Sequence, residues 1–380
     1  MIEKMLRSAQ HDTPRVLVAM SGGVDSSVAA ALLVEQGYDV VGATMKLFCY
    51  GDDVPDRPCC SLDSINDARR VCQSLGIPHY VLNLESAFGH DVVDNFVVEY
   101  SRGHTPIPCV RCNTFTKFRD FVRRADAIDA RYVATGHYAR VIDGELYRGV
   151  DHSKDQSYFL WGIDRDILAR MILPVGSQSK AETRAVAHRL GLEVVAEKIE
   201  SQDICFVPDG DHTKIIRRKL GDDAPALRRG PFVLSSGEIV GEHNGYARFT
   251  IGQRRGVPGG FREPMFVVAI RPHDRAVVIG PREELLGHGL VAREVNWLTA
   301  SVQLPTEDSQ LAVQVRHRAR PAPATLIRND GDEIELALDE PLSAITPGQS
   351  AVFYDGDRVL GGGIIERARG ARASLPVLAA

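Results

Sequence analysis

The strongest signal of fold in this sequence is Val16-Leu17-Val18-Ala19-Met20-Ser21-Gly22-Gly23-Val24-Asp25-Ser26-Ser27. The apolar run predicts a buried strand over 16–20, and the two glycines predict a tight turn into a helix over 26–36. Backbone N–H groups of this turn and of the first helical residues would form an anion site that the helix dipole strengthens. The loop lacks the Gly-Lys-Ser/Thr of a Walker A loop, and an acidic residue at position 25 favours a nucleotide that carries Mg²⁺. The same pattern is also compatible with an ordinary glycine-rich turn between a strand and a helix.

Strand and helix patterns alternate over residues 16–140. The apolar periodicity predicts strands over 16–20, 40–47, 79–83 and 132–135, and helices over 26–36, 61–75, 92–103 and 117–127. Gly37 and Gly76 follow two of these helices as C-terminal stop signals. Further helices are predicted over 164–171 and 179–190, the second with capping-box spacing between Ser179 and Glu182. We therefore expect an α/β fold, with an N-terminal parallel sheet, flanking helices and a ligand beyond the carboxyl ends of the strands.

The sequence pattern changes near residue 210, where short β segments separated by glycines replace the alternation of strands and helices. Such segments occur at 230–237, 265–270 and 276–279 and predict a small β-rich domain. The later strands, predicted over 291–298, 311–317, 324–327, 333–338, 350–354 and 358–365, have the spacing of a β-barrel. We thus expect three domains, over 1–210, 211–282 and 283–380, with a frayed tail over 371–380.

Composition narrows the class of protein. The chain has 380 residues, a formal net charge of −5 and 44% apolar residues, as in ordinary globular proteins. We find no apolar run long enough for a membrane span and no signal peptide, so we expect a cytoplasmic protein. Residues 211–280 hold 12 Lys and Arg against 7 Asp and Glu, a basic segment that either meets phosphates or is a solvated surface.

The seven cysteines indicate catalysis or metal binding rather than a disulfide scaffold in such a compartment. Cys109 and Cys112 follow Pro106 and Pro108, so we predict that they lie in an ordered, non-helical loop. Arg111 and Lys117 nearby would favour their thiolate forms. Alone, the two could form a redox pair or half of a zinc site, and Cys205 lies far away in a polar-flanked segment. The default for the other four, Cys49, Cys59, Cys60 and Cys72, is an incidental or buried thiol.

Beside the glycine loop, the cysteine pair suggests ATP-driven sulfur insertion, and here the chain resembles a known family. It is similar to the tRNA-specific 2-thiouridylases (MnmA/TrmU family) of the PP-loop ATP pyrophosphatase superfamily. The resemblance runs in family order from about residue 14 to 367. Its motifs are Ala19–Ser26, Cys112-Asn113, Ala134–Tyr138, Lys154–Leu160, Ile204-Cys205-Phe206, Thr250–Gly256, Thr346–Tyr354 and Gly361–Ile365.

The resemblance implies roles for individual residues of this chain. Residues implied to bind ATP are Ala19, Met20, Ser21, Gly22, Gly23, Val24, Asp25, Ser26, Met45 and Gly136, with Asp25 near Mg²⁺. Residues implied to contact tRNA are His137, Lys154, Asp155 and Gln156, and, in the later domains, Arg316, His317 and Gln349. Without the resemblance, the sequence favours Gln349 as a turn residue. It is equally compatible with His137 as a structural histidine and as a tRNA contact.

The resemblance also implies a reaction. The family converts uridine 34, the wobble base of tRNAs for Lys, Glu and Gln, to 2-thiouridine. ATP would adenylate the C2 oxygen, Cys205 would carry a persulfide received from an upstream sulfur donor such as a cysteine desulfurase or a sulfur relay, and Cys112 would be the second catalytic cysteine. The implied cofactors are ATP and Mg²⁺, and the implied RNA partner is the anticodon stem-loop, whose unpaired bases are readily extruded.

One position departs from the family. Many members have Asn-Pro-Asp where this chain has Ile107-Pro108-Cys109. The substitution leaves a second scheme open, in which Cys109, Cys112 and Cys205 hold a [4Fe–4S] cluster with one open iron. Two other classes also stay open: an ATP-dependent amide or C–N synthetase with the same loop, which gives the cysteines no task, and a non-enzymatic RNA-binding module.

Overall fold

The computed structural model describes residues 13–48, 62–198, 204–207, 209–299 and 304–370. The chain divides into two compact units. The first comprises residues 1–92, 109–208 and 357–359, and the second comprises residues 93–108, 209–356 and 360–380. Cys49, Cys59 and Cys60 lie outside the described residues.

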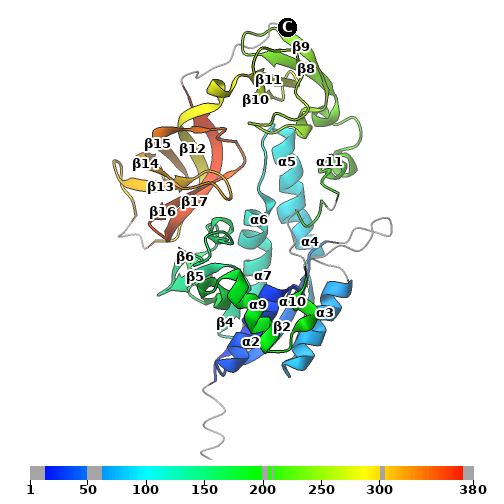
Figure 1. Ribbon diagram of the computed structural model, residues 1–380, viewed down its shortest axis with the longest axis vertical. Coiled ribbons are helices and arrows are strands. Elements are labelled where there is room, and N and C mark those ends of the chain that lie inside the picture. Colours follow the sequence, from blue (N-terminus) through cyan, green and yellow to red (C-terminus); the bar gives the residue numbers. More distant parts are fainter. Residues whose placement is uncertain (1–12, 49–61, 199–203, 208, 300–303, 371–380) are drawn as a thin grey trace, which may run out of the picture. The chain divides into compact units, whose positions relative to one another are not determined.

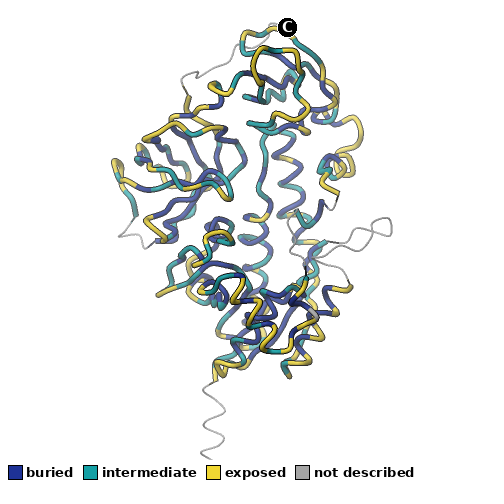
Figure 2. The backbone as a smooth tube through the Cα atoms, in the orientation of Figure 1, coloured by how far each residue is buried: buried dark blue, intermediate teal, exposed yellow. Residues whose placement is uncertain are grey.

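The first unit contains a five-stranded parallel sheet in the order β3-β2-β1-β4-β7. These strands are β1 (Arg15–Ala19), β2 (Asp39–Lys46), β3 (His79–Asn83), β4 (Tyr132–Ala134) and β7 (Met171–Ile172). Val16, one residue into β1, pairs with Val40 on one side and Tyr132 on the other, so β1 is central in the sheet. Buried aliphatic residues of β1, including Val16 and Val18, pack against Val28 and Leu33. Figure 2 colours the backbone by burial: β1 is buried over most of its length, whereas the edge strand β3 is intermediate to exposed.

Helices alternate with these strands (Figure 1). They are α2 (Val24–Glu35), α3 (Leu62–Ser74), α4 (Glu85–Phe88), α6 (Pro108–Arg111), α7 (Arg119–Asp126), α8 (Arg165–Leu168), α9 (Lys180–Arg189) and α10 (Glu193–Ala196), with π-helical segments η1 (Gly89–Asp94) and η2 (Cys112–Phe118) and 3₁₀ turns η3 (Ser157–Phe159) and η4 (Pro174–Ser177). Gly37 and Gly76 end α2 and α3 with φ of +85° and +68°, as the stop-signal interpretation requires. The capping box at Ser179 is formed, with both of its hydrogen bonds present. The predicted α/β fold class is confirmed.

The prediction of a non-helical loop around Cys109 and Cys112 is wrong. Pro108 begins α6, and Cys112 begins the π-helix η2 that leads into α7. The physical reason is the position of Pro108 at the first helical residue, where a missing N–H costs nothing and the fixed φ of proline suits a helix.

The sequence analysis also missed a hairpin formed by β5 (Ala139–Ile142) and β6 (Glu145–Arg148). Asp143 and Gly144 form its turn with φ of +53° and +77°. An Asp-Gly pair between strands is a known hairpin signal that could have identified it.

The second unit contains a four-stranded sheet in the order β10-β11-β8-β9. Its strands are β8 (Arg229–Leu234), β9 (Ile239–Asn244), β10 (Phe266–Arg271) and β11 (Ala276–Gly280). The helix α11 (Thr213–Leu220) and the 3₁₀ turns η5 (Pro225–Leu227) and η6 (Tyr246–Arg248) accompany this sheet. The buried residues Val233, Ala276 and Val278 form its small core.

The later strands of the second unit form a barrel. After the 3₁₀ turn η7 (Arg282–Leu285), β12 (Leu286–Trp297), β13 (Gln310–Gln314), β14 (Ala322–Asn329), β15 (Glu333–Ser343), β16 (Ser350–Asp355) and β17 (Arg358–Arg369) lie in the order β12-β15-β14-β13-β16-β17. An additional antiparallel pairing of β12 with β17 closes the sheet on itself. The predicted C-terminal β-barrel is therefore confirmed, while the three-domain boundaries stay a prediction.

A short early segment belongs to the second unit. The helix α5 (Asn95–Ser101) lies in it, and Ser101 accepts a hydrogen bond of 2.7 Å from the Tyr246 hydroxyl. Thr105 donates its N–H to Pro347 at 2.9 Å, accepts from the Gln349 amide at 2.7 Å and bonds Thr250 at 3.0 Å. Thr105 thus joins an N-terminal segment to residues from both later β regions.

Within the part of the chain that the structure describes, no helix has the length and apolarity needed to cross a membrane.

Candidate functional site

The loop after β1 has its own hydrogen-bond network. Ser26 Oγ accepts from the Ser21 N–H at 3.1 Å and donates to the Gly23 carbonyl at 3.1 Å. Ser27 Oγ donates to the same carbonyl at 2.8 Å. Because the serines bond the loop to the start of α2, the loop is held in one conformation at a helix N-terminus, the geometry that suits an anion.

Two glycines of the site have no room for a side chain. At Gly22, with φ of +72°, a Cβ would lie 2.2 Å from the Ser64 carbonyl oxygen. At Gly136, a Cβ would lie 2.6 Å from the backbone of Asp25 and Ser26. Gly22 allows the loop to pack on α3, and Gly136 allows the loop after β4 to pack on the start of α2.

A pocket of about 260 Å³ lies at this loop in the first unit. It brings together residues from the ends of three strands, from η2 and α7, and from the segment before residue 208. The predicted site residues that line it are Ala19, Met20, Ser21, Asp25, Ser26, Met45, Gly136, His137, Gln156 and Cys205. Gly22, Gly23 and Val24 belong to the same loop but are not among the lining residues. Thr44, Leu47, Lys117, Phe118, Phe121 and Thr135 complete the lining and were not predicted as site residues.

The carboxylate of Asp25 has two partners that the sequence analysis missed. Lys180 Nζ lies 2.7 Å from Oδ1 and 2.9 Å from Oδ2. The Tyr138 hydroxyl donates to Oδ1 at 2.8 Å. Both partners are buried, since Lys180 is 8% exposed and Tyr138 is 3% exposed. Asp25 therefore approaches the pocket as part of an ion pair, not as an isolated anion.

A second lysine, Lys198, follows α10 and contacts the Ser21–Ser26 loop. Lys198 donates to the Gly22 carbonyl at 3.0 Å and forms an ion pair with Asp67 of α3. Asp67 is 8% exposed, so its charge needs this compensation. Lys198 thus connects the nucleotide-type loop to the stretch of chain that leads toward Cys205.

The three cysteines singled out from the sequence differ in their surroundings. Cys205 is partly exposed and lines the pocket. Cys112 is buried and begins η2, whose Lys117 and Phe118 line the same pocket. Cys109 is exposed on α6. Burial raises the pKa of the Cys72 thiol to about 11, as expected for a cysteine of the core.

Arg111 does not simply face a thiol. Its guanidinium lies 4.7 Å from the centroid of the Phe115 ring and donates to the Asp91 carbonyl at 3.2 Å. Lys117, by contrast, shares the pocket with Cys205. The basic residue in the pocket is thus the lysine of η2.

A three-cysteine metal site is not formed by the side chains that the structure describes. Cys109, Cys112 and Cys205 all lie in described segments, yet no group of three or more His, Cys, Asp or Glu in those segments converges on one point. As placed in the structure, Cys109, Cys112 and Cys205 therefore form no site for an iron–sulfur cluster.

His137 lies three residues after the end of β4 and lines the pocket. Its Nδ1 is 2.8 Å from Thr135 Oγ1, and the Phe118 ring centroid is 6.1 Å from its own. Burial and the positive charge of Lys117 lower the pKa of His137 to about 3. His137 is therefore neutral at physiological pH and can exchange hydrogen bonds with a base without repelling Lys117.

The neighbouring predicted tRNA contacts have internal hydrogen bonds. Gln156 Oε1 accepts from the Tyr138 N–H at 2.9 Å. The Asp155 carboxylate accepts from the N–H groups of Gly149 and Ser157 at 3.0 and 3.1 Å and from the Ser157 hydroxyl. These bonds fold the segment after β6 against the pocket, and tRNA contact by Lys154, Asp155 and Gln156 stays a prediction.

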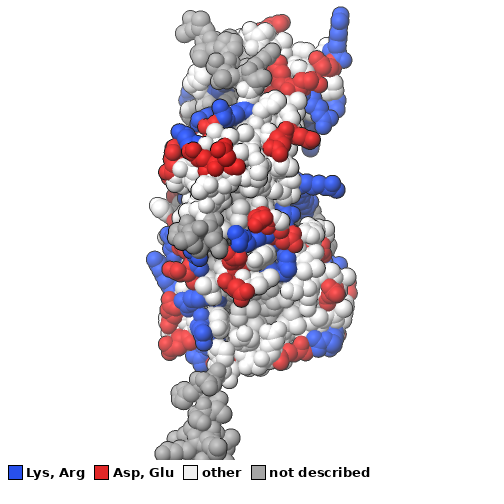
Figure 3. Space-filling view, turned by 90° about the vertical axis from the view of Figure 1, so that its left-hand side faces the viewer, with Lys and Arg blue, Asp and Glu red and all other residues white. Residues whose placement is uncertain are grey.

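The remaining predicted tRNA contacts lie in the barrel of the second unit. Arg316 donates to the Ala344 carbonyl at 2.7 Å, and Gln349 donates to Thr105 as described above. His317 follows Arg316 and is partly exposed. On the face drawn in Figure 3, basic and acidic side chains are interspersed rather than gathered by sign.

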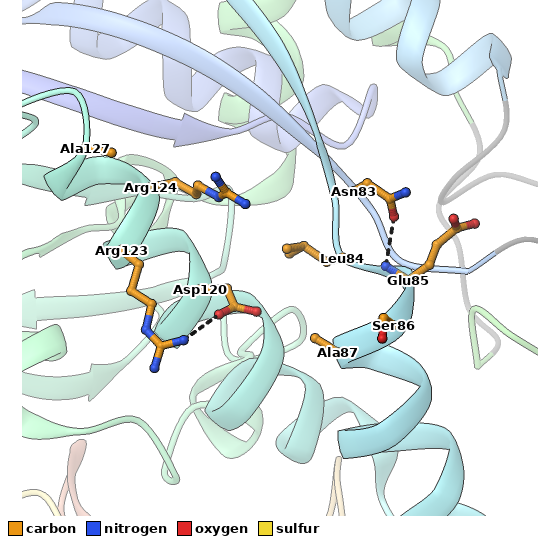
Figure 4. Close-up of a pocket in the computed structure, with 9 residues that line it drawn as sticks. All are labelled: Asn83, Leu84, Glu85, Ser86, Ala87, Asp120, Arg123, Arg124 and Ala127. Atoms are coloured by element: carbon orange, nitrogen blue, oxygen red, sulfur yellow. Dashed lines mark hydrogen bonds and ion pairs between the residues drawn. The ribbon is translucent and has the colours of Figure 1, made fainter.

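A second and larger hollow, of about 790 Å³, lies elsewhere in the first unit. Residues 83–87 at the end of β3 and residues of α7 line it (Figure 4). Arg123 there is 3.3 Å from Asp120, and the Glu85 N–H is bonded to Asn83. None of the predicted site residues lines it, so the smaller pocket is the candidate site.

Three family models match the chain in succession. A tRNA methyl transferase HUP domain matches residues 14–209, a tRNA methyl transferase PRC-barrel domain matches residues 220–281, and an aminomethyltransferase β-barrel domain matches residues 287–365.

Similar curated proteins span nearly the whole chain. The tRNA-specific 2-thiouridylase MnmA of Carboxydothermus hydrogenoformans is 45% identical over 93% of this chain and 98% of its own length. That of Geobacter metallireducens is 46% identical over 93% and 97%, and that of Rhodospirillum centenum 46% identical over 96% and 94%.

Proposed function

Because the chain belongs to the tRNA-specific 2-thiouridylase family, we propose that it replaces the C2 oxygen of the wobble uridine, U34, of tRNAs for Lys, Glu and Gln by sulfur. Membership makes the protein an enzyme, a tRNA sulfurtransferase that forms 2-thiouridine. The observation that best supports the finer proposal is the pocket in which Cys205 and the Ser21–Ser26 loop lie together. A phosphate-type loop beside a cysteine suits a reaction that couples ATP cleavage to sulfur transfer.

In the proposed first step, the C2 oxygen of the uridine attacks the α-phosphate of ATP, and pyrophosphate leaves. The start of α2 would offer backbone N–H groups to the phosphates, while the hydroxyls of Ser21 and Ser26 hold the loop by bonds within it. Gly136 lets the loop after β4 pack closely on this helix start. Mg²⁺ bound by ATP would neutralise part of the phosphate charge, and Asp25 is the carboxylate of the pocket lining that would face it.

In the proposed second step, sulfur replaces the adenylated oxygen. The terminal sulfur of a Cys205 persulfide attacks C2, AMP leaves, and the Cys112 thiolate attacks the bridging Cys205 sulfur to release the thiolated base. Alternatively, Cys112 attacks the persulfide first and frees sulfide, which then displaces AMP. Either order ends in a Cys112–Cys205 disulfide, which a thiol reductant must reduce by two electrons before the next turnover.

Both orders need Cys112 and Cys205 on the same pocket, and two observations support that arrangement. Cys205 lines the pocket directly, and Cys112 begins the π-helix that supplies Lys117 and Phe118 to it. The sulfur itself must come from an upstream donor such as a cysteine desulfurase or a sulfur relay, and we propose that the reaction takes place in the cytoplasm.

Three other candidate functions are weaker. A methyl transfer, the word in two of the family descriptions, requires neither an ATP-cleaving loop nor two cysteines. A C–N synthetase leaves Cys112 and Cys205 without a task, and an RNA-binding module leaves the loop without one. We propose no step through an iron–sulfur cluster, because Cys109, Cys112 and Cys205 do not converge on one point in the structure.

The deciding experiment is an assay with ATP, persulfide generated by a cysteine desulfurase and unmodified tRNA. Nucleoside mass spectrometry measures 2-thiouridine, and a coupled assay measures pyrophosphate. Cys205→Ser should abolish persulfide-dependent thiolation while pyrophosphate is still released, and the core variant Cys72→Ala should keep both activities. Full thiolation by the Cys205 variant would refute the role of that residue, and activity of anaerobically purified, iron-free enzyme would confirm that no cluster is needed.

A further inference from the structure

The loop that would bind phosphates carries no cationic side chain of its own. Between Met20 and Ser27 the only charged residue is Asp25, and it is acidic. An unpaired carboxylate in this position would repel a polyphosphate, because charges a few ångströms apart interact strongly where water is partly excluded. The structure supplies the missing charge from a residue 155 positions away, Lys180.

Lys180 is held with its ammonium facing Asp25. It is the first residue of α9, where the capping box of Ser179 and Glu182 fixes the helix start. Its own N–H is bonded to the Asp151 carboxylate at 3.1 Å, and its ammonium lies 5.5 Å from the centroid of the Tyr138 ring. The side chain is 10% exposed, so the pair is shielded from solvent on the lysine side.

Asp25 is the more accessible member of the pair. Its side chain is 30% exposed and lines the pocket, whereas Lys180 does not. The lysine therefore acts from behind the carboxylate, on the side away from the ligand space. This arrangement distinguishes it from a lysine that grips phosphates directly.

We propose that Lys180 is a positioning residue of the nucleotide site. It cancels the charge of Asp25 and, together with the Tyr138 hydroxyl, fixes the orientation of that carboxylate, so that a nucleoside triphosphate can settle on the Ser21–Ser26 loop. The identity of the triphosphate as ATP rests on the proposed function, but the electrostatic role of Lys180 does not.

The same two helices offer a matched control. Arg189, near the end of α9, forms a bidentate ion pair with Glu35 at the end of α2, at 2.6 and 2.9 Å. This pair also joins α9 to α2, but it is largely exposed and does not line the pocket. If Lys180 served only to hold the helices together, loss of Arg189 would have a comparable effect.

The test measures binding of ATP by calorimetry in EDTA, without metal or tRNA, for Lys180→Met, Asp25→Asn, the double variant and Arg189→Met. Lys180→Met should raise the dissociation constant about tenfold or more, because one uncompensated negative charge then faces the phosphates. Asp25→Asn added to Lys180→Met should restore binding to within about threefold of Asp25→Asn alone, since no charge then remains to be cancelled. Arg189→Met should bind like the wild type.

Three results would overturn the inference. Unchanged binding by Lys180→Met would show that the charge of Asp25 needs no cancelling, and equally weak binding by the double variant would show that Lys180 contacts the phosphates itself. A loss in Arg189→Met equal to that in Lys180→Met would assign the effect to helix packing. If Lys180→Met fails to fold, the double variant can still overturn the inference, because binding weaker than that of Asp25→Asn would show that Lys180 contacts the phosphates itself. Wild-type enzyme that binds no ATP even when Mg²⁺ is supplied would refute the proposed function instead.

Discussion

The two adjacent glycines of the loop should respond very differently to the same methyl group. An alanine at Gly22 must adopt φ of +72°, and its Cβ would lie 2.2 Å from the Ser64 carbonyl oxygen. An alanine at Gly23 keeps φ of −102°, and its Cβ would lie 3.4 Å from the mobile end of Ser21. Gly22→Ala is therefore expected to be damaging and Gly23→Ala to be mild.

The magnitude follows from the two costs at Gly22. Left-handed backbone costs a non-glycine residue about 1–2 kcal/mol, and overpacking against backbone costs about 1–3 kcal/mol. We thus expect Gly22→Ala to lower the free energy of unfolding by about 2–5 kcal/mol, and Gly23→Ala by less than about 1 kcal/mol. Relief of the contact to an ordinary C···O distance of about 3.3 Å requires the loop to move by roughly 1 Å, which can cost a hundredfold in kcat/KM.

The assay can isolate the unit concerned. The chain has two tryptophans, and Trp161 is 4% exposed in the first unit while Trp297 belongs to the second. In a Trp297→Phe background, urea unfolding followed by fluorescence reports the first unit alone. Equal stability and equal kcat/KM for Gly22→Ala and Gly23→Ala would refute the assignment of Gly22 as a position of tight backbone contact.

The other predictions concern one residue each. Gly136→Ala should weaken ATP binding by at least about tenfold, measured by calorimetry, because its Cβ would lie 2.6 Å from the backbone of Asp25; unchanged affinity would contradict the close packing. Lys198→Met should lower the free energy of unfolding by about 1–3 kcal/mol in the same fluorescence assay, because it removes a cation from buried Asp67; Lys198→Arg should recover most of it. Burial raises the pKa of the Glu99 carboxyl, but a hydrogen bond and neighbouring cations outweigh it and hold the pKa below the usual 4.5. Glu99 therefore stabilises the fold above pH 4.5, and this contribution is lost as the pH falls through the lower folded pKa. Glu99→Gln should be less stable than wild type at pH 7, with the difference shrinking on acidification; a pH-independent difference would exclude ionisation as the cause.

Sequence patterns were sufficient to predict those parts of the site whose residues are consecutive in the chain. The Ser21–Ser26 loop is a short strand–turn–helix, so its residues carry both the conformation and the chemistry in one stretch. The closed barrel was predictable for a similar reason, since each strand alternates with a turn signal. The misplaced segment around Cys112 shows the limit of such rules: Pro108 reads as a helix breaker but in fact begins a helix.

Tertiary partners could not be predicted in this way. In the sequence, Lys180 could be recognised only as the residue that follows the helix cap Ser179. Nothing within its helix indicates that it pairs with Asp25, 155 positions earlier. Lys198 likewise reaches Gly22 across 176 positions. Both contacts depend on how helices pack on the sheet, which hydrophobic periodicity alone does not determine. The sequence analysis recognised Asp25, but it did not predict the ion pair of Asp25 with Lys180.

The route of the chain between the two units has a consequence for biosynthesis. The first unit is complete only when residues 357–359 are present, and Asp357 bonds both Arg140 and Arg148. Residues 93–108 likewise wait for Tyr246, Thr250 and Pro347 before their hydrogen bonds can form. When the first 208 residues have been synthesised, neither unit therefore has all the residues that belong to it. A fragment that stops at residue 208 would keep Lys180 and Lys198 beside the nucleotide loop, but it would lack the bonds that Arg140 and Arg148 make to Asp357.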